Sequence, residues 1–281
     1  MSSPFNTTGS AKAFHLDVQG VEPQDVIGDA LILQTSTKAG DVEGDEPAVR
    51  VPRVTLDGAP GFVPEGDAID ESDPDDSETV IHTGKIAVLT SVSREQYGQG
   101  TASTLLNAAV RRAMVRKANS AYLAQAAPVG PAVTPPAGLL HQSFHDGGIL
   151  DESLDGLIDA VAFIEDDGGV ASHIIASPTA WAELQKFKTA TDSNQSLVGA
   201  GTSSATRQVL SLPVVTDRDV PAGELLVVDK NAILAVWGQL LIATSSDFHF
   251  NRDSIAIRAT WRFGQQIAHP NRVVVLGIGG S

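Results

Sequence analysis

Alternation of apolar and polar residues in the first third of the chain predicts two extended strands. Residues 47–56, PAVRVPRVTL, alternate Val49 and Val51 with Arg50, and Pro52 restricts this run to the edge of a sheet. Residues 79–93, TVIHTGKIAVLTSVS, are rich in β-branched side chains and predict a returning strand. The connection is about twenty residues long, against about 2–5 in most hairpins. Because an isolated ribbon is only marginally stable in water, we expect this hairpin to lie on another surface.

The connection is crowded with carboxylates. Residues 65–78 contain neither Lys nor Arg and carry these acids: Glu65, Asp67, Asp70, Glu71, Asp73, Asp75, Asp76 and Glu78. A calcium site, a solvated insert and a docking arm are the three interpretations of this run. The calcium site is disfavoured, because the EF-hand glycine is missing, Pro74 interrupts the acids, and Ile81 stands where the twelfth-position Glu is required.

A long helix follows the second strand. Ser93 and Gln96 have the spacing of a capping box, and residues 101–127 run without Gly or Pro. Apolar residues including Leu106 and Val110 share one face. Four cations lie on the rest of this helix: Arg111, Arg112, Arg116 and Lys117.

The second half of the chain has a compact α/β pattern. The proline-rich residues 128–138 predict a domain boundary. Helices are expected at 151–168 and 177–188, the second with Ser177 as N-cap and Pro178 at the first position. Strands are expected at these residues: 171–177, 212–216, 225–230, 239–246, 254–268 and 272–278. Near the start, residues 29–35, DALILQT, predict another strand, and the polar residues 1–28 predict an arm.

Composition excludes several classes of function. The 281 residues carry a net charge of −15, which disfavours phosphate contacts with nucleic acid. The chain has no cysteine, which removes disulfides, thiolate zinc sites and Cys nucleophiles. We expect no secretion signal, because the N-terminus has no basic start followed by an apolar run. We expect a soluble protein, because no apolar run approaches the roughly 20 residues that span a bilayer.

Candidate catalytic groups are few. His141, His145 and Asp146 could bind zinc if their segment were helical, which makes a metal-dependent hydrolase the enzyme alternative. The segment lacks the Glu of a H-E-x-x-H motif and lies between prolines and a Gly pair, so we expect polar loop residues instead. Residues 199–204 are Gly-rich but lack a phosphate-loop lysine, and no G-x-S-x-G motif is present. The sequence therefore predicts no catalytic residue, metal or cofactor.

Taken in order, these elements resemble the major capsid proteins of tailed bacteriophages, which have the Hong Kong 97-type capsid fold. The resemblance spans roughly residues 29–278. It is carried by the helix from Thr101 and by GFVPEGDAI, GKIAVLTSVSREQY, ASPTAWAELQKFK and RATWRFGQQIAHPNRVVVL. It implies an α+β fold of five parts. These are an N-arm (1–28), a strand and extended E-loop hairpin (29–90), a P-domain with a spine helix (91–149), an α/β A-domain (150–235) and return strands completing the P-domain (236–281).

The resemblance also implies a function, which is structural and not enzymatic. Subunits would form hexamers and pentamers that close into an icosahedral shell around double-stranded DNA, without sequence-specific binding. The protein would belong to the virion and assemble in the bacterial host cytoplasm. A separate scaffolding protein, a portal and decoration proteins are the implied partners, and a membrane is not. An encapsulin-like nanocompartment shell is the alternative within the same fold. Cross-linking through a lysine at the E-loop tip is not expected, because residues 57–77 contain no Lys.

In this family the E-loop lies across a neighbouring subunit. We therefore expect the acidic tip to dock on basic surface of that neighbour, with Arg111, Arg112, Arg116 and Lys117 as the first candidates. Phe62 and Val63 would supply the apolar part of this contact.

Overall fold

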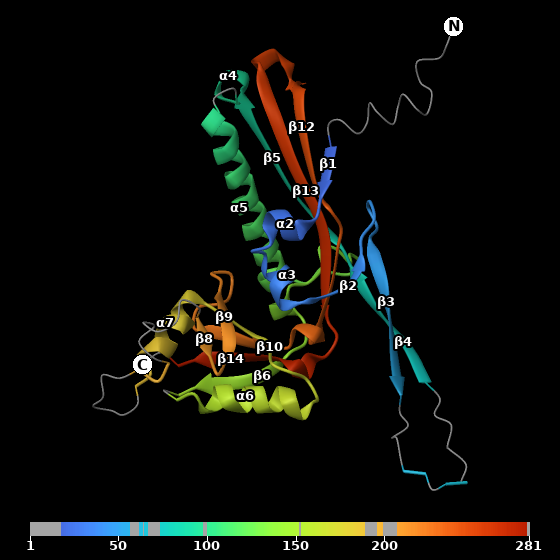
Figure 1. The fold of residues 1–281 in the computed structure, drawn as a ribbon, viewed down its shortest axis with the longest axis vertical. Helices are drawn as coiled ribbons and strands as arrows, with labels where there is room; N and C mark the ends of the chain where they lie inside the picture. The colour runs from blue at the N-terminus through green and yellow to red at the C-terminus, as the bar shows by residue number, and fades with distance from the viewer. Residues whose placement is uncertain are drawn as a thin grey trace.

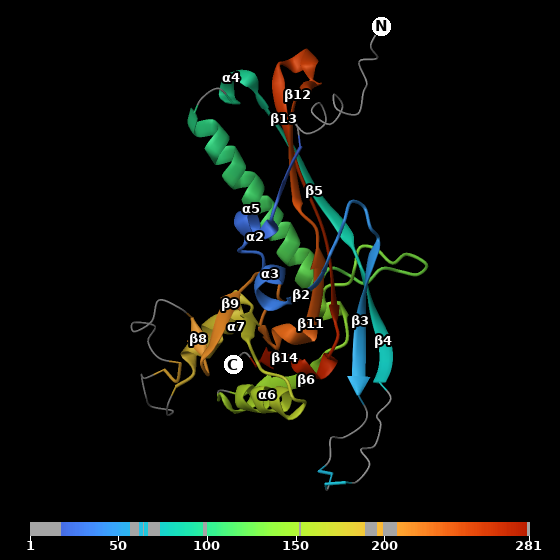
Figure 2. The same cartoon turned by 45° about the vertical axis from the view of Figure 1, so that its right-hand side comes forward.

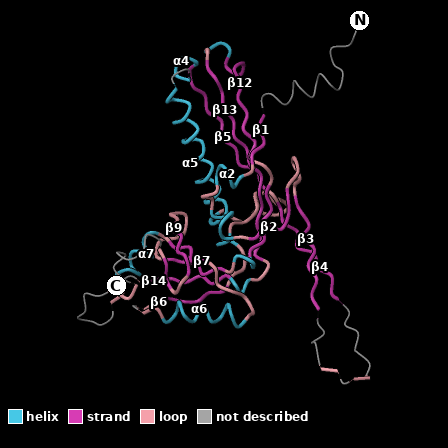
Figure 3. Tube along the Cα trace, in the orientation of Figure 1, coloured by secondary structure: helices cyan, strands magenta, loops and turns pink. Residues whose placement is uncertain are grey.

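A computed structural model describes residues 18–56, 62–63, 65–66, 74–97, 100–151, 153–188, 196–198 and 207–279. In this part of the chain two six-stranded sheets and a separate two-stranded ribbon combine with α-helices, which confirms the predicted α+β class (Figures 1 and 3). Among these residues, no helix is both long and apolar enough to cross a membrane.

The first sheet, called the long sheet here, is built around β13. Its order is β1-β12-β13-β11-β2, and β5 also pairs with β13. The strands are β1 Val18–Val21, β2 Thr37–Asp41, β5 Gly84–Ser93, β11 Ile233–Trp237, β12 Leu240–His249 and β13 Ser254–Ile267. β13 is antiparallel to β5, β12 and β11, whereas β2 runs parallel to β11.

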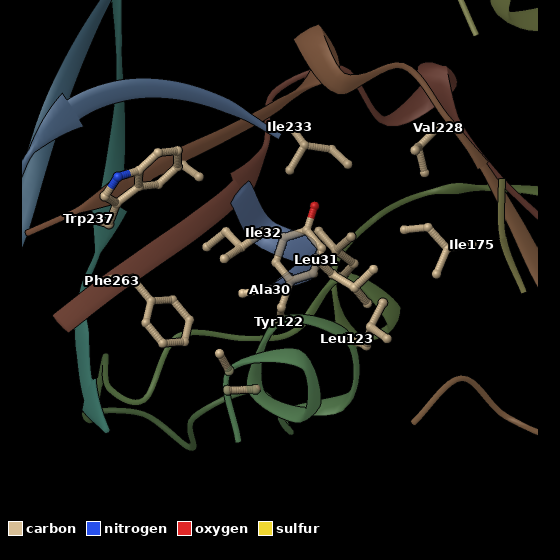
Figure 4. Close-up of a cluster of buried hydrophobic side chains, with 14 of the residues drawn as sticks. Ala30, Leu31, Ile32, Tyr122, Leu123, Ile175, Val228, Ile233, Trp237 and Phe263 are labelled. Atoms are coloured by element: carbon tan, nitrogen blue, oxygen red, sulfur yellow. The ribbon is translucent and has the colours of Figure 1, made fainter. Parts of the chain in front are cut away.

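Helix α5 (Gly100–Ala124) lies along one face of the long sheet (Figure 1). Its buried Met114, Ala118 and Tyr122 pack on inward-facing residues of the sheet such as Trp261 and Phe263. The short helices α2 (Pro23–Ile27), α3 (Leu31–Thr35) and α4 (Arg94–Tyr97) also contact α5. Figure 4 shows Tyr122 among Leu31, Ile32 and their neighbours in this core.

Two polar groups fix α3 on α5. The Tyr122 hydroxyl lies 3.0 Å from that of Thr35, and burial raises the pKa of Tyr122. The backbone N–H of Leu31, at the start of α3, donates to Asn119 Oδ1 at 2.9 Å.

The second sheet has the order β6-β14-β10-β7-β9-β8. Its strands are β6 His145–Leu150, β7 His173–Ala176, β8 Gln208–Val209, β9 Leu212–Thr216, β10 Glu224–Val228 and β14 Val273–Ile278. Helices α6 (Asp155–Asp166) and α7 (Pro178–Lys186) share a core with one face of this sheet, and the other face adds to the core around α3 and α5. Short 3-10 turns complete the chain at η1 Leu139–His141, η2 Lys230–Ala232, η3 Phe250–Arg252 and η4 Pro270–Arg272.

The ribbon consists of β3 (Ala48–Leu56) and β4 (Pro74–His82), paired from Ala48↔His82 to Leu56↔Pro74. It extends away from both sheets (Figures 1 and 2). The predicted hairpin is therefore confirmed. The run predicted as one returning strand, residues 79–93, is divided between two strands at Thr83. β4 pairs with β3, whereas β5 pairs with β13.

Several sequence predictions are wrong in detail. Residues 29–35 contain the helix α3 and not a strand; its Leu31 and Ile32 are buried in the core with α5, and its first N–H donates to Asn119. Within the segment predicted as an arm, residues 18–27 form β1 and α2. The acidic stretch from Asp75 to Glu78 belongs to β4 and not to the loop.

Each sheet combines strands from distant parts of the chain. β14 lies inside the second sheet, so residues 236–281 do not all return to the long sheet. Its residues Val273–Leu276 are buried on both faces, as expected for a continuous apolar strand covered on both sides. Conversely, β11 joins the long sheet although it begins before residue 236, and β6 joins the second sheet although it begins before residue 150.

Candidate interaction surfaces

The base of the ribbon is held firmly to the long sheet. The Thr83 N–H donates to Pro47 O at 2.9 Å, and the Thr83 hydroxyl donates to Glu46 O at 2.5 Å. Arg262, on β13, donates to the same hydroxyl at 3.0 Å. Ile81 of β4 is fully buried in a small cluster with Val42 and Val236. These contacts fix the direction in which the ribbon leaves the sheet.

A close backbone approach and an arginine add to this anchor. A Cβ on Gly264 of β13 would lie 2.1 Å from His82 O, so only glycine fits there without a shift. Farther along the ribbon, Arg53 donates to Ala268 O at 3.4 Å and lies 3.4 Å from His269 Nδ1. Partial burial and the positive charges of Arg53 and Arg272 lower the pKa of His269.

The outer end of the ribbon carries exposed apolar and acidic groups. Phe62 is fully exposed, at 109% of its reference area, and Val63 and Glu65 are exposed too. Glu78 forms an exposed ion pair with Arg50 on the facing strand, at 2.9 Å. Asp75 and Asp76 belong to β4. The other acids predicted for the tip lie outside the described residues: Asp67, Asp70, Glu71 and Asp73.

The four helix cations do not form one surface. Arg111, Arg112 and Arg116 are exposed along an open groove of about 430 Å³ between α5 and the loop after β9, called the helix groove here. Lys117 lines a different hollow, with Lys85 and Pro136.

The helix groove is also partly neutralised from within the chain. Arg111 is paired with Asp29 at 2.7 Å. Arg218, Asp217 and Asp219 line the groove as well, and Asp217 accepts from Asn119 Nδ2 at 2.8 Å. The sequence prediction did not include Asp217, Arg218 and Asp219. The charged run TDRDV (216–220), which begins at the end of a strand, could have indicated a charged surface loop there.

A second surface lies on the face of the long sheet that α5 does not cover. Ala243, Arg258 and Leu89 are cross-strand neighbours there, whereas the next row, Ile242, Ala259 and Val88, packs inward. Around the first row is an opening of about 320 Å³, called the apolar hollow here, lined by Leu89, Ala243, Thr244, Ser245, Phe248, Ala256 and Arg258. Leu89 and Phe248 are 56% and 59% exposed.

The geometry required for a helical zinc site is absent from residues 141–146. His141 ends η1, whereas His145 begins β6 and stacks on the Phe163 ring with centroids 3.8 Å apart. Asp146 accepts from the N–H of Gly148 at 2.9 Å. Across the described part of the chain, no cluster of three or more His, Asp or Glu side chains could hold a metal ion.

Comparison with known proteins gives a consistent picture. The profile of the phage capsid family matches residues 35–278. A chain of Gordonia phage Cozz has a TM-score of 0.67 at 15% identity, covering 99% of this chain and 96% of that chain. A chain of Microbacterium phage Oxtober96 has a TM-score of 0.64 at 14% identity, covering 89% and 91%. The capsid of a native GTA particle, computed with C5 symmetry, has a TM-score of 0.64 at 15% identity and covers 100% of both chains. No curated protein sequence matches significantly.

Proposed function

Because the chain belongs to the phage capsid family, we propose that it is the major capsid protein of a tailed bacteriophage, assembling as hexamers and pentamers into an icosahedral shell around double-stranded DNA. The single observation that carries this proposal is the family match over residues 35–278, to which the Hong Kong 97-type fold adds support. The protein is thus a structural component of a virion. Assembly in the cytoplasm of the host, beside a portal, a scaffolding protein and decoration proteins, is part of the proposal.

The ribbon explains how one chain becomes part of a shell. A projecting ribbon is marginally stable alone, and an exposed Phe favours burial against a partner. We propose that the ribbon and its acidic tip lie on a second copy, as the E-loop does in this family. The firm anchor at Thr83 and Gly264 supports this role, because a ribbon of fixed direction presents its tip at a reproducible place.

Two surfaces could receive the acidic tip. One comprises the helix cations, although Arg111 has an intrachain partner and Lys117 lies apart. The other is the uncovered face of the long sheet. Exposed ion pairs contribute only about 0–1 kcal/mol each, so either surface would set orientation through charge and obtain most of its affinity from apolar burial.

The overall charge is compatible with a DNA container. A net charge of −15 limits adhesion of the shell to the packaged duplex, while local basic groups remain free to contact it.

The test is electron microscopy of the purified protein at two concentrations and two salt levels, alone and after co-expression with candidate scaffolding proteins. We expect closed shells or rings of five and six subunits. Monomers under every condition would overturn the proposal. Closed particles that never contain DNA when produced during phage infection would instead favour a nanocompartment shell.

A further inference from the structure

The helix groove concentrates arginines in a chain that is acidic overall. Its charged lining residues are four arginines and three aspartates: Arg111, Arg112, Arg116, Arg218, Asp29, Asp217 and Asp219. Together these groups carry a net charge of +1, whereas the whole chain carries −15. A local excess of cations on an acidic protein directs an anionic ligand to that place.

Three of the four arginines are available to a ligand. Arg111 is held by Asp29 at 2.7 Å. Arg112, Arg116 and Arg218 are exposed, and their side chains have no ion-pair or hydrogen-bond partner in the described part of the chain. Arg112 and Arg116 are four positions apart on α5, so they lie on the same side of the helix, about 6 Å apart along its axis. A guanidinium group forms two parallel hydrogen bonds with a phosphate or a carboxylate, so this groove suits a ligand with several such anions.

The groove is held in shape by hydrogen bonds within the chain. The Asp217 carboxylate, in the loop after β9, accepts from Asn119 Nδ2 of α5 at 2.8 Å and from the N–H of Asp219 at 2.9 Å. These bonds tie the loop that carries Arg218 to the helix that carries the other arginines. They also engage both oxygens of Asp217, which makes this acid a weaker competitor for the arginines. A site that is formed in advance loses less entropy when a ligand binds.

The backbone of a DNA duplex matches this arrangement. Each strand carries one phosphate per about 3.4 Å of helix axis, so the roughly 6 Å between Arg112 and Arg116 spans about two phosphates. An open groove of about 430 Å³ is too small to admit a duplex, and the base edges therefore stay outside it. Contact with phosphates alone does not depend on base sequence, which suits a container for DNA.

We propose that the helix groove binds the phosphate backbone of double-stranded DNA through Arg112, Arg116 and Arg218. This inference rests on the proposed shell function and deepens it by naming the residues through which the shell contacts its contents. Asp217 and Asp219 keep each contact weak. Many weak contacts repeated over a shell hold the DNA collectively, and no single subunit retains it when it leaves.

The salt dependence of DNA binding measures the number of phosphate contacts. Each neutralised phosphate contributes about −0.9 to the slope of log affinity against log salt, so three contacts predict a slope of about −2.7. The affinity should therefore fall about 40-fold between about 50 and 200 mM salt. The assay is fluorescence anisotropy of a short labelled duplex, titrated with the full-length protein below its assembly concentration.

Replacement of one arginine should remove one contact. Arg112→Gln, Arg116→Gln and Arg218→Gln should each make the slope shallower by about 0.9, which leaves about a 12-fold fall over the same salt range. The matched control is Arg258→Gln on the uncovered face of the long sheet. This arginine is also exposed, and its side chain has no partner among the described residues. We expect its replacement to leave the slope unchanged.

Asp29→Asn tests the groove in the opposite direction. This change releases Arg111 from its ion pair, so a fourth phosphate contact should steepen the slope by about 0.9. The Asp29 side chain is 75% exposed, so no core contact is removed. A general loss of structure could not produce such a gain.

Three results would overturn the groove as the DNA site and leave the shell function standing. The first is an equal slope for Arg112→Gln and Arg258→Gln. The second is displacement of the duplex by inorganic phosphate at the same phosphate concentration, because an isolated phosphate cannot bridge several arginines. The third is binding of a poly-glutamate peptide without binding of the duplex, which would mark the groove as a surface for an acidic protein segment. Absence of particles in the electron microscopy test would instead overturn the shell function, on which this inference rests.

Discussion

Substitution of Gly264 by Ala should destabilise the protein, although the opposite is usual for glycine in a strand. Gly→Ala in regular structure ordinarily stabilises by about 0.5–1 kcal/mol, because the unfolded chain loses freedom. At Gly264 the new methyl group would lie 2.1 Å from His82 O and 3.2 Å from Ile81 Cγ2. A carbonyl oxygen cannot rotate away as a side chain can. The end of β4 or β13 must therefore shift by about 1 Å, and overpacking of this kind costs about 1–3 kcal/mol.

Thermal unfolding followed by circular dichroism measures this effect. For a chain of this size, about 1 kcal/mol corresponds to roughly 2–4 °C, so we expect a melting temperature about 2–12 °C lower. The control is Gly277→Ala on β14, where the nearest atom to the added methyl group would be at an ordinary 3.7 Å. Because the shift occurs at the base of the ribbon, particle yield should fall further than stability alone explains. Equal melting temperatures for the two variants would refute the close-approach argument.

Three other predictions concern stability. Asn119→Ala should lower the free energy of unfolding by about 1–3 kcal/mol in urea titrations, because the buried N–H of Leu31 loses its acceptor. The control is Asn107→Ala, at an exposed position on the same helix, which should have little effect. Equal losses in the two variants would contradict this role of Asn119. The lowered pKa of His269 favours its neutral form in the folded protein, so its stabilising contribution is present above about pH 6.5 and is lost as pH falls toward the folded-state pKa. On acidification, the urea midpoint of the unmodified protein should therefore fall more steeply than that of the His269→Asn variant. Parallel slopes for the two proteins would exclude this role. Ser177→Ala removes an acceptor for the N–H groups of Ala180 and Gly223 and should cost about 1 kcal/mol in thermal unfolding; an unchanged melting temperature would show that the cap is dispensable.

Elements defined by local signals were predictable from sequence. Helix α7 begins where Ser177 and Pro178 indicate, and Ser177 Oγ accepts from Ala180 N at 3.1 Å. The long helix occupies Gly100–Ala124, close to the expected 101–127. Most of its length follows from a run without Gly or Pro, which needs no knowledge of distant residues.

Elements defined by distant contacts were not predictable. The run Leu31–Leu33 suits a strand or a buried helix equally well, and the helix α5 that it packs against, including its hydrogen-bond partner Asn119, lies far away in the sequence. Likewise, the apolar run at 273–276 indicates burial on both faces but not which sheet provides it.

Only some of the residues of the interaction surfaces could be predicted from the sequence. Phe62 and the acids attract notice because they lie in an unusually long connection. The residues of the apolar hollow do not attract notice in the sequence, because Leu89 and Arg258 become neighbours only through the register of β5 on β13. That Leu89 is exposed depends on which face of the sheet α5 covers, and this is set by the packing of the whole helix.

The order of strands along the chain has a consequence for synthesis. β13 joins β5, β12 and β11, and β14 joins β6 to β10, yet both strands lie after residue 253 of the 281 residues. A nascent chain that stops before residue 254 has the other strands of both sheets. It lacks β13, which connects the strands of the long sheet, and β14, which connects β6 to the rest of the second sheet. Pairing between strands so far apart in the sequence is expected to be slow, because the loops must close before the contacts stabilise them. We therefore expect prematurely terminated chains to lack a complete long sheet and to be left out of assembled particles.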